Sequence, residues 1–407
     1  MKEVAKDKVK HADVDFSLER VPLTARKPFI AMFVIMLGFT FFSASMSVGA
    51  KMANGLDLTQ FLWAVLIGGA ILGAYTGVLA YISNETGMSL DLLTHRSFGT
   101  IGSFLPSALI SFTQIGWFGV GVAMFAYPAA ELLKIPVWVL VVIAGIAMTS
   151  SAYFGIKGLE IVSYVSVPLI TILGTYSMIT AVRDGGGIVS IFDKSTGGMT
   201  LFAAIGMVIG SFVSGGTATP NFTRFAKTKK SAVITPVIAF FLGNTLMFMF
   251  GAVGGAYTGQ EDIFYVMIAQ GLAIPALIVL GANIWTTNDN ALYTGGLGLS
   301  NITKIRKRPM VLVSGVIGTA TAIWLYNNFI GWLSFLNATL PPIGAIITID
   351  YFLNRGKYTE ENDDKLRKVN VFALLGVVAG ALVGNFVKWG ISAINAMVVA
   401  CIVYYLG

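Results

Sequence analysis

The chain has 407 residues, of which 56% are hydrophobic and only 12% are charged, and its mean hydropathy is +0.78. A soluble domain carries about 25% charged residues, so this composition excludes a soluble globular protein and indicates one all-α, polytopic membrane domain. The net charge of +7 comes from basic residues scattered over short loops, which argues against nucleic-acid binding. The single cysteine, Cys401, excludes an intramolecular disulfide and a cysteine-rich metal site.

Apolar segments long enough to cross a hydrocarbon core of about 30 Å follow a polar N-terminal segment, residues 1–28. The first apolar run is too long for the hydrophobic part of a cleavable signal peptide. Twelve transmembrane helices are predicted, at residues 29–50, 60–83, 101–126, 136–155, 160–182, 201–219, 231–256, 265–300, 309–326, 330–353, 369–387 and 391–407. The eighth window exceeds the length of one span, so its start at 265–273 is a candidate for a separate loop helix. In the tenth, Pro341 and Pro342 predict a kink.

The distribution of lysine and arginine predicts the orientation. Of the 27 such residues, 22 lie in the N-terminal segment and the even-numbered loops, and 5 lie in the odd-numbered loops. Because cytoplasmic loops of membrane proteins carry the excess of Lys and Arg, both termini are expected in the cytoplasm.

The first and sixth segments both carry Gly, Ser, Thr and Phe at mid-membrane depth, at residues 36–45 and 207–219. Close helix packing explains small residues in either segment alone. However, five spans separate the starts of the two segments, so the second would be an inverted copy of the first. The third and eighth segments form a second pair, each with an amide a few residues before a tryptophan. Paired, interrupted helices in two inverted halves indicate the central site of a transporter.

The eighth segment concentrates polar side chains at residues 283–290. Such a run at membrane depth is expected to face a cavity, an ion or a ligand rather than lipid. Asn283, Thr286 and Thr287 share one helix face, and an interruption near Gly38 and Phe41 would free backbone carbonyls. Together these groups predict a five-oxygen sodium site, and hydrogen bonds to neighbouring helices are an equally weighted alternative. Neutral oxygen ligands suit a monovalent ion, because divalent cations usually recruit carboxylates.

A second group of residues suits a planar heterocycle. Aromatic faces stack on nucleobases, and carboxamides complement their donor and acceptor edges. The candidate substrate-binding residues are Gln114, Trp117, Phe212, Ser214, Asn288 and Asn290. Asp289 is a candidate proton carrier, although a hydrogen bond to a neighbouring span is the preferred interpretation.

These segments resemble the cytosine permeases of the nucleobase–cation symporter-1 family. The matching strings are LGFTFFSASM at 37–46, TQIGWFGVGVAMFA at 113–126, NIWTTNDNALY at 283–293 and LYNNF at 325–329. The resemblance extends over nearly the whole chain from about residue 21.

The resemblance implies a fold like that of the bacterial leucine transporter, with five-plus-five inverted repeats and two extra C-terminal helices. The expected divisions are a cytoplasmic segment at 1–28, a first repeat at 29–182, a second repeat at 201–353 and the last two helices at 369–407. It also implies cytosine import by alternating access, coupled to sodium bound by Gly38, Phe41, Asn283, Thr286 and Thr287. The expected location is the bacterial cytoplasmic (inner) membrane. No other cofactor and no obligate protein partner are expected.

Other functions remain open on the residues alone. Proton coupling, or transport of uracil, hydantoin or allantoin, are the main rivals. A channel would need a continuous polar stripe, whereas the polar clusters lie only near mid-membrane. An enzyme is disfavoured because the chain has no intramembrane histidine and no HExxH, GxSxG or P-loop string.

Overall fold

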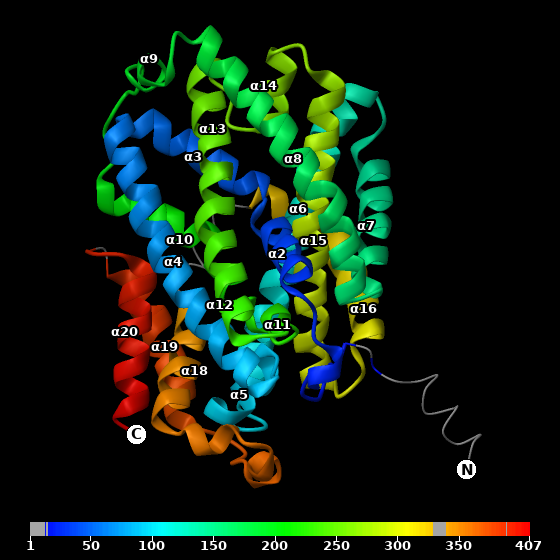
Figure 1. Ribbon diagram of the computed structural model, residues 1–407, viewed down its shortest axis with the longest axis vertical. Coiled ribbons are helices and arrows are strands. Elements are labelled where there is room, and N and C mark those ends of the chain that lie inside the picture. Colours follow the sequence, from blue (N-terminus) through cyan, green and yellow to red (C-terminus); the bar gives the residue numbers. More distant parts are fainter. Residues whose placement is uncertain (1–12, 14, 329–338, 388) are drawn as a thin grey trace, which may run out of the picture.

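The computed structural model describes residues 13, 15–328, 339–387 and 389–407. In these residues the chain is almost entirely helical, and it forms no β-sheet beyond an isolated bridge between Lys27 and Ala226. The helices run along the long axis of the molecule as a bundle (Figure 1).

The helices are given in chain order. The first half contains η1 (Leu23–Ala25), α2 (Phe29–Thr40), α3 (Ser43–Gly55), α4 (Leu58–Thr86), α5 (Leu90–Phe98), α6 (Phe104–Leu133), α7 (Val137–Tyr153), α8 (Ile156–Asp184) and α9 (Ile188–Phe192). The second half contains α10 (Leu201–Ala218), α11 (Pro220–Thr223), α12 (Lys229–Ile238), the π-helical η2 (Ala239–Gly243), α13 (Asn244–Thr258), α14 (Ile263–Ala269), α15 (Ala273–Thr303), α16 (Lys307–Asn327), α18 (Pro341–Leu353), η3 (Arg355–Tyr358), η4 (Glu360–Lys365), α19 (Val371–Phe386) and α20 (Ser392–Tyr405).

The first span is broken in the middle. Helices α2 and α3 meet at an angle of 54° on either side of Phe41 and Phe42. The backbone at Phe42 is extended, with φ −133° and ψ 131°. The carbonyls in the last turn of a helix have no partner within that helix, so the break frees polar backbone atoms inside the bundle. The predicted interruption near Gly38 is therefore present.

The predicted interruption of the sixth segment, within residues 207–219, is wrong. Helix α10 passes through Gly215 and Gly216 and continues through Thr219, which keeps helical angles, into α11. The Thr217 hydroxyl bonds the Val213 carbonyl of the preceding turn over 2.9 Å and so remains within the helical pattern. The glycines instead leave room for side chains, because a Cβ at Gly215 would lie 2.3 Å from the ring of Phe212 on the same helix and one at Gly216 would lie 3.1 Å from Thr76 of α4.

The eighth window contains two helices, as the sequence suggested, although α14 begins at Ile263 and α15 at Ala273. In the tenth window, Pro341 and Pro342 are the first residues of α18, and proline suits the first turn of a helix. The earlier part of that window, 330–338, lies outside the described residues, so the predicted kink stays a prediction.

By length and composition, six of the described helices are able to cross a membrane, or seven with the bent α2–α3 pair, and four shorter apolar helices accompany them. The number twelve therefore stays a prediction. So does the division into two inverted repeats.

The loops that were predicted to be cytoplasmic lie together at one end of the bundle. In Figure 1, α5, the 355–368 loop and the C-terminus are all at the bottom. Backbone bonds link them, including Val21 N–H to the Gly87 carbonyl over 2.9 Å and Thr100 N–H to the Arg367 carbonyl over 3.0 Å. Their position at one end of the bundle agrees with the prediction that these loops lie on the same side of the membrane.

Residues 15–21, called here the N-terminal strap, cross the same end of the bundle. The Asp15 carboxylate accepts from Ile156 N–H over 3.0 Å and pairs with Lys307 Nζ at 2.7 Å. Arg224 donates to the carbonyls of Asp15 and Phe16, over 2.8 and 2.9 Å. Lys307 and Arg224 are both fully buried, so the strap provides the polar partners of two buried cations.

Candidate substrate and cation site

An internal cavity lies next to the break between α2 and α3. Its volume is about 20 Å³, enough for a water molecule but not for a heterocycle. It is lined by Phe39, Phe42, Gln114, Trp117, Ser211, Phe212, Ser214, Gly215, Thr287 and Ala291. Four elements therefore meet here: the broken first span, α6, α10 and α15.

Four of the six predicted substrate-binding residues line this cavity: Gln114 and Trp117 from α6, and Phe212 and Ser214 from α10. Gln114 and Trp117 are three residues apart and so share one helix face. The Nε2 group of Gln114 is buried and has no hydrogen-bond partner among the described residues. Leaving such a donor unpaired costs about 1–3 kcal/mol, which favours a ligand with an acceptor at this position.

The aromatic walls include two residues that the sequence did not single out. Phe42 meets Trp117 edge to face, with ring centroids 5.4 Å apart and planes at 81°. Phe39 meets Phe212 in the same way at 5.2 Å and 83°. Edge-to-face contacts fix the orientation of the Trp117 and Phe212 rings. Ser211 also lines the cavity. The one feature of the sequence that points to Ser211 is its spacing, three residues before Ser214.

The structure does not bring Asn288 or Asn290 to the cavity. Thr287 and Ala291, one helical turn apart, are the residues of α15 that line the cavity. Asn288 donates to the Phe118 carbonyl over 3.1 Å. Asn290 donates to the Thr286 carbonyl of its own helix over 2.6 Å. Of the three predicted amide residues, Gln114 is therefore the one that lines the cavity.

The residues of the predicted sodium site do come together. The Thr287 hydroxyl donates to the Phe41 carbonyl over 3.0 Å and joins α15 to the break in the first span. A Cβ placed on Gly38 would lie 3.3 Å from Thr286 Cβ and 2.6 Å from the hydroxyl oxygen of Ser163 on α8. The last turn of α2 is thus packed tightly between α15 and α8, and glycine at position 38 permits this approach.

Two buried oxygen atoms in this region have no partner among the described residues: Asn283 Oδ1 and Ser163 Oγ. The Asn283 amide nitrogen lies 3.6 Å from the sulfur of Met247, a weak acceptor. Neutral oxygen atoms beside the carbonyls of a broken helix match the preference of a hard monovalent cation. The sequence did not reveal Ser163, because nothing distinguishes it from Ser166 and Ser177 of the same helix. No group of three or more His, Cys, Asp or Glu side chains suited to a metal occurs in the described residues.

Asp289 is fully buried on α15 but does not line the cavity. One carboxyl oxygen accepts from Asn290 Nδ2 over 3.3 Å, and the other has no hydrogen-bond partner among the described residues. Asp289 is thus separated from both the cavity face and the contact between Thr287 and Phe41.

Comparison with known proteins identifies the family. Residues 20–407 match the model of the permeases for cytosine/purines, uracil, thiamine and allantoin. The chain is also 46% identical to the cytosine permease of Escherichia coli (strain K12) over 395 residues, covering 97% of this chain and 94% of that protein. The chain belongs to this permease family. A more distant relative, a purine-uracil permease of Arabidopsis thaliana, is 22% identical over 75% of this chain and 58% of its own length.

Solved structures confirm the fold. The nucleobase–cation-symport-1 transporter Mhp1, closed with bromovinylhydantoin bound, superposes with a TM-score of 0.78 at 19% identity, covering 93% of this chain and 91% of Mhp1. A Na⁺-coupled sialic acid symporter in an outward-open state gives 0.71 at 16% identity, over 94% and 90%. The permease is therefore an integral membrane transporter of the predicted fold class, not an enzyme, and its family and relatives support nucleobase transport.

Proposed function

We propose that this permease imports cytosine together with sodium by alternating access across the bacterial inner membrane. The observation that carries the proposal is the bond from the Thr287 hydroxyl to the Phe41 carbonyl. It connects the candidate cation site to the wall of the candidate substrate cavity, because Thr287 belongs to both groups.

The substrate assignment is supported by the cavity lining and by the 46% identity to a cytosine permease. Trp117 and Phe212 supply apolar ring faces, and Gln114 supplies an amide that can donate and accept along one edge of a base. Ser214 adds a hydroxyl. Asn288 and Asn290 would reach a substrate only after a rotation of α15 or a change of rotamer.

The proposed sodium ligands are the carbonyls near the break, at Gly38 and Phe41, and the oxygen atoms of Asn283, Thr286 and Thr287. Sodium bound there would hold the end of α2 against α15. That contact would also fix Phe42, which packs on Trp117. Ion binding would thereby order the aromatic wall that the base stacks on, and the coupling would be reciprocal.

Transport requires the cavity to expand. A volume of about 20 Å³ cannot contain a pyrimidine ring, so the helices around it must separate to admit substrate. The break in the first span is the natural hinge, since a few residues at a helix end absorb the change in backbone angles.

Uptake into proteoliposomes tests the proposal directly. Radiolabelled cytosine should accumulate when sodium is outside, and choline in place of sodium should abolish accumulation. Thermal stabilisation of the purified permease by cytosine, and much less by uracil, would support the substrate. Equal stabilisation by the two bases would reject it. Uptake that follows pH and ignores sodium would favour Asp289 as a proton carrier.

A further inference from the structure

A pocket of about 370 Å³ opens at the predicted cytoplasmic end, about the α5 helix and the 355–368 loop. It is far larger than the internal cavity and shares no lining residue with it. Its lining residues are Arg96, Gly356, Lys357, Asn362, Lys365, Leu366 and Arg367. Four of these seven are cationic, and no carboxylate is among them.

Arg96 lines this pocket and is the most buried of its four cations. Its side chain is only 6% exposed. One terminal nitrogen donates to the carbonyls of Lys357 and Asn362, over 3.4 and 3.3 Å, and the other pairs with Asp363. The Nε group is buried and has no hydrogen-bond partner among the described residues. A buried, charged donor without an acceptor is costly, and an anion would satisfy it.

The local charge is not balanced within the described residues. Asp363 is shared between Arg96 and Arg20, so one carboxylate faces two guanidinium groups. Lys357 pairs with Asp350 at 3.0 Å. Lys365 and Arg367 are exposed and have no ion pair in the part of the chain that the structure describes. The pocket therefore presents excess positive charge.

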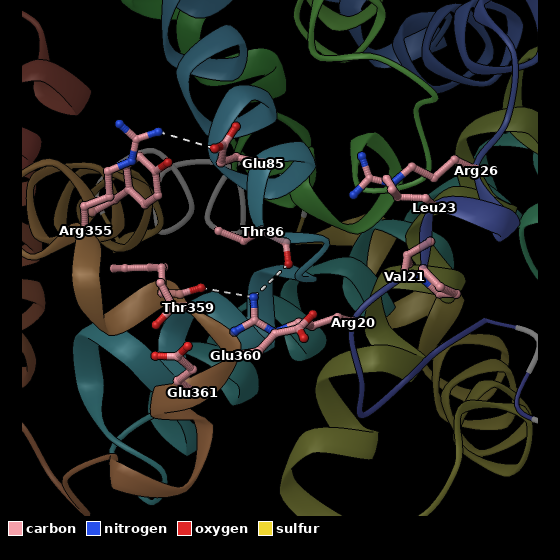
Figure 2. A pocket seen from close by; sticks show the side chains of 13 residues that line it. Arg20, Val21, Leu23, Arg26, Glu85, Thr86, Arg355, Thr359, Glu360 and Glu361 are labelled. Atoms are coloured by element: carbon pink, nitrogen blue, oxygen red, sulfur yellow. Dashed lines mark hydrogen bonds and ion pairs between the residues drawn. The ribbon is translucent and has the colours of Figure 1, made fainter.

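A neighbouring pocket of about 710 Å³ provides a comparison. It is lined by three arginines and three glutamates, so its field is mixed. Figure 2 shows two of its arginines already occupied: Arg20 points to the Thr86 carbonyl, and Arg355 points to Glu85. Arg26 of that pocket also has a buried Nε without a hydrogen-bond partner among the described residues, but its three glutamates offset the positive charge. The 370 Å³ pocket differs in having no carboxylate in its lining.

The surroundings of the 370 Å³ pocket indicate which kind of anion it binds. Four residues after Arg367 the chain enters the apolar helix α19, where Val371, Phe372 and Leu375 are 57%, 43% and 50% exposed. The pocket thus lies at the level where an apolar helix face gives way to basic residues. Phosphate groups of anionic lipids occupy that level, and basic pockets there recognise their headgroups.

We propose that this pocket binds a phosphoryl group, that of an anionic phospholipid of the cytoplasmic leaflet, between Arg96, Lys365 and Arg367. The site is pre-organised, because the N–H groups of Ile101 and Gly102 bond the Lys368 carbonyl over 2.8 and 3.1 Å and fix the loop. Binding would brace α5 against the loop before α19. This proposal is independent of the substrate and of the coupling ion.

Thermal unfolding of the purified permease in an uncharged detergent tests the site. The probes are dioctanoyl phosphatidylglycerol, dioctanoyl phosphatidylcholine and inorganic phosphate. We expect phosphatidylglycerol to raise Tm in a saturable way, with little effect of phosphatidylcholine at the same concentration. If inorganic phosphate gave the same rise at the same concentration, the site would stand and free phosphate would be its ligand.

The variant Lys365→Ala/Arg367→Ala removes two exposed charges and is expected to fold. Each cation near a lipid surface contributes on the order of a factor of five in affinity, so the midpoint concentration should rise about thirtyfold. The matched control, Lys227→Ala/Lys230→Ala, removes two exposed charges from the start of α12 and the residues before it, and it should respond like the wild type. An unchanged midpoint in the first variant, or equal responses to the two lipids, would overturn the proposal.

Discussion

Replacing Thr287 with valine should uncouple cytosine binding from sodium. The side chain is 4% exposed, and its hydroxyl donates to the Phe41 carbonyl over 3.0 Å. Valine keeps the shape and removes the oxygen, so both the helix contact and one proposed sodium ligand are lost. An interaction with a charged partner contributes about 1.5–3 kcal/mol, which corresponds to roughly tenfold to 150-fold weaker sodium binding.

The assay measures cytosine affinity of the purified permease over a sodium series, with choline keeping the ionic strength constant. The wild type should bind cytosine more tightly as sodium rises, and sodium more tightly as cytosine rises, by the same factor. Thr287→Val should need at least about tenfold more sodium for the same cytosine affinity.

Two controls make this result specific. Thr287→Ser keeps the hydroxyl and should retain most of the sodium response. Thr294→Val removes a hydroxyl from the same helix that has no hydrogen-bond partner among the described residues, and it should behave like the wild type. A sodium requirement within twofold of wild type in Thr287→Val would refute the assignment of this residue to the cation site.

Three further predictions follow from the geometry. Trp117→Ala and Gln114→Ala should each abolish uptake while the protein still reaches the membrane. Near-normal uptake by a well-expressed Trp117→Ala variant would show that the Trp117 ring contributes only to packing and does not bind the substrate. Ser163→Ala should raise the sodium concentration for half-maximal uptake severalfold if the Ser163 hydroxyl binds the ion. An unchanged dependence of uptake on sodium would show that Ser163 is not a sixth ligand beside the five predicted ones. Asp15→Asn should lower stability by about 3–5 kcal/mol, because it leaves Lys307 buried and unpaired, and thermal unfolding measures the loss; a wild-type Tm would show that the pair is not closed in solution.

The sequence predicted the parts of the fold that composition and local pattern determine. Membrane helices follow from apolar length, and the break near Gly38 follows from small and hydroxyl residues clustered in an apolar run. The same reasoning failed at Gly215 and Gly216, because it cannot tell a glycine that interrupts a helix from one that makes room for nearby side chains. The contacts with Phe212 of the same helix, with Phe39 of α2 and with α4 distinguish the two.

The direction of side chains on a helix is a second feature that the sequence did not predict. Residues 283–290 were correctly recognised as a polar cluster, but the pattern does not say which face of α15 meets the cavity. Thr287 and Ala291 line the cavity, whereas the amides of Asn288 and Asn290 bond the carbonyls of Phe118 and Thr286. The sequence also did not predict the contacts of the N-terminal strap, because Asp15 and Lys307 are far apart in sequence and no local pattern links them.

That separation has a consequence for biosynthesis. The strap is synthesised before its partners, which lie 141, 209 and 290 residues later. The Asp15 carboxylate therefore lacks its Lys307 partner until the chain has been made as far as the start of α16. Contacts over such distances form late, because the loop entropy is lost before the contact is gained. A nascent chain stalled before Lys307 would thus leave the strap without its buried ion pair.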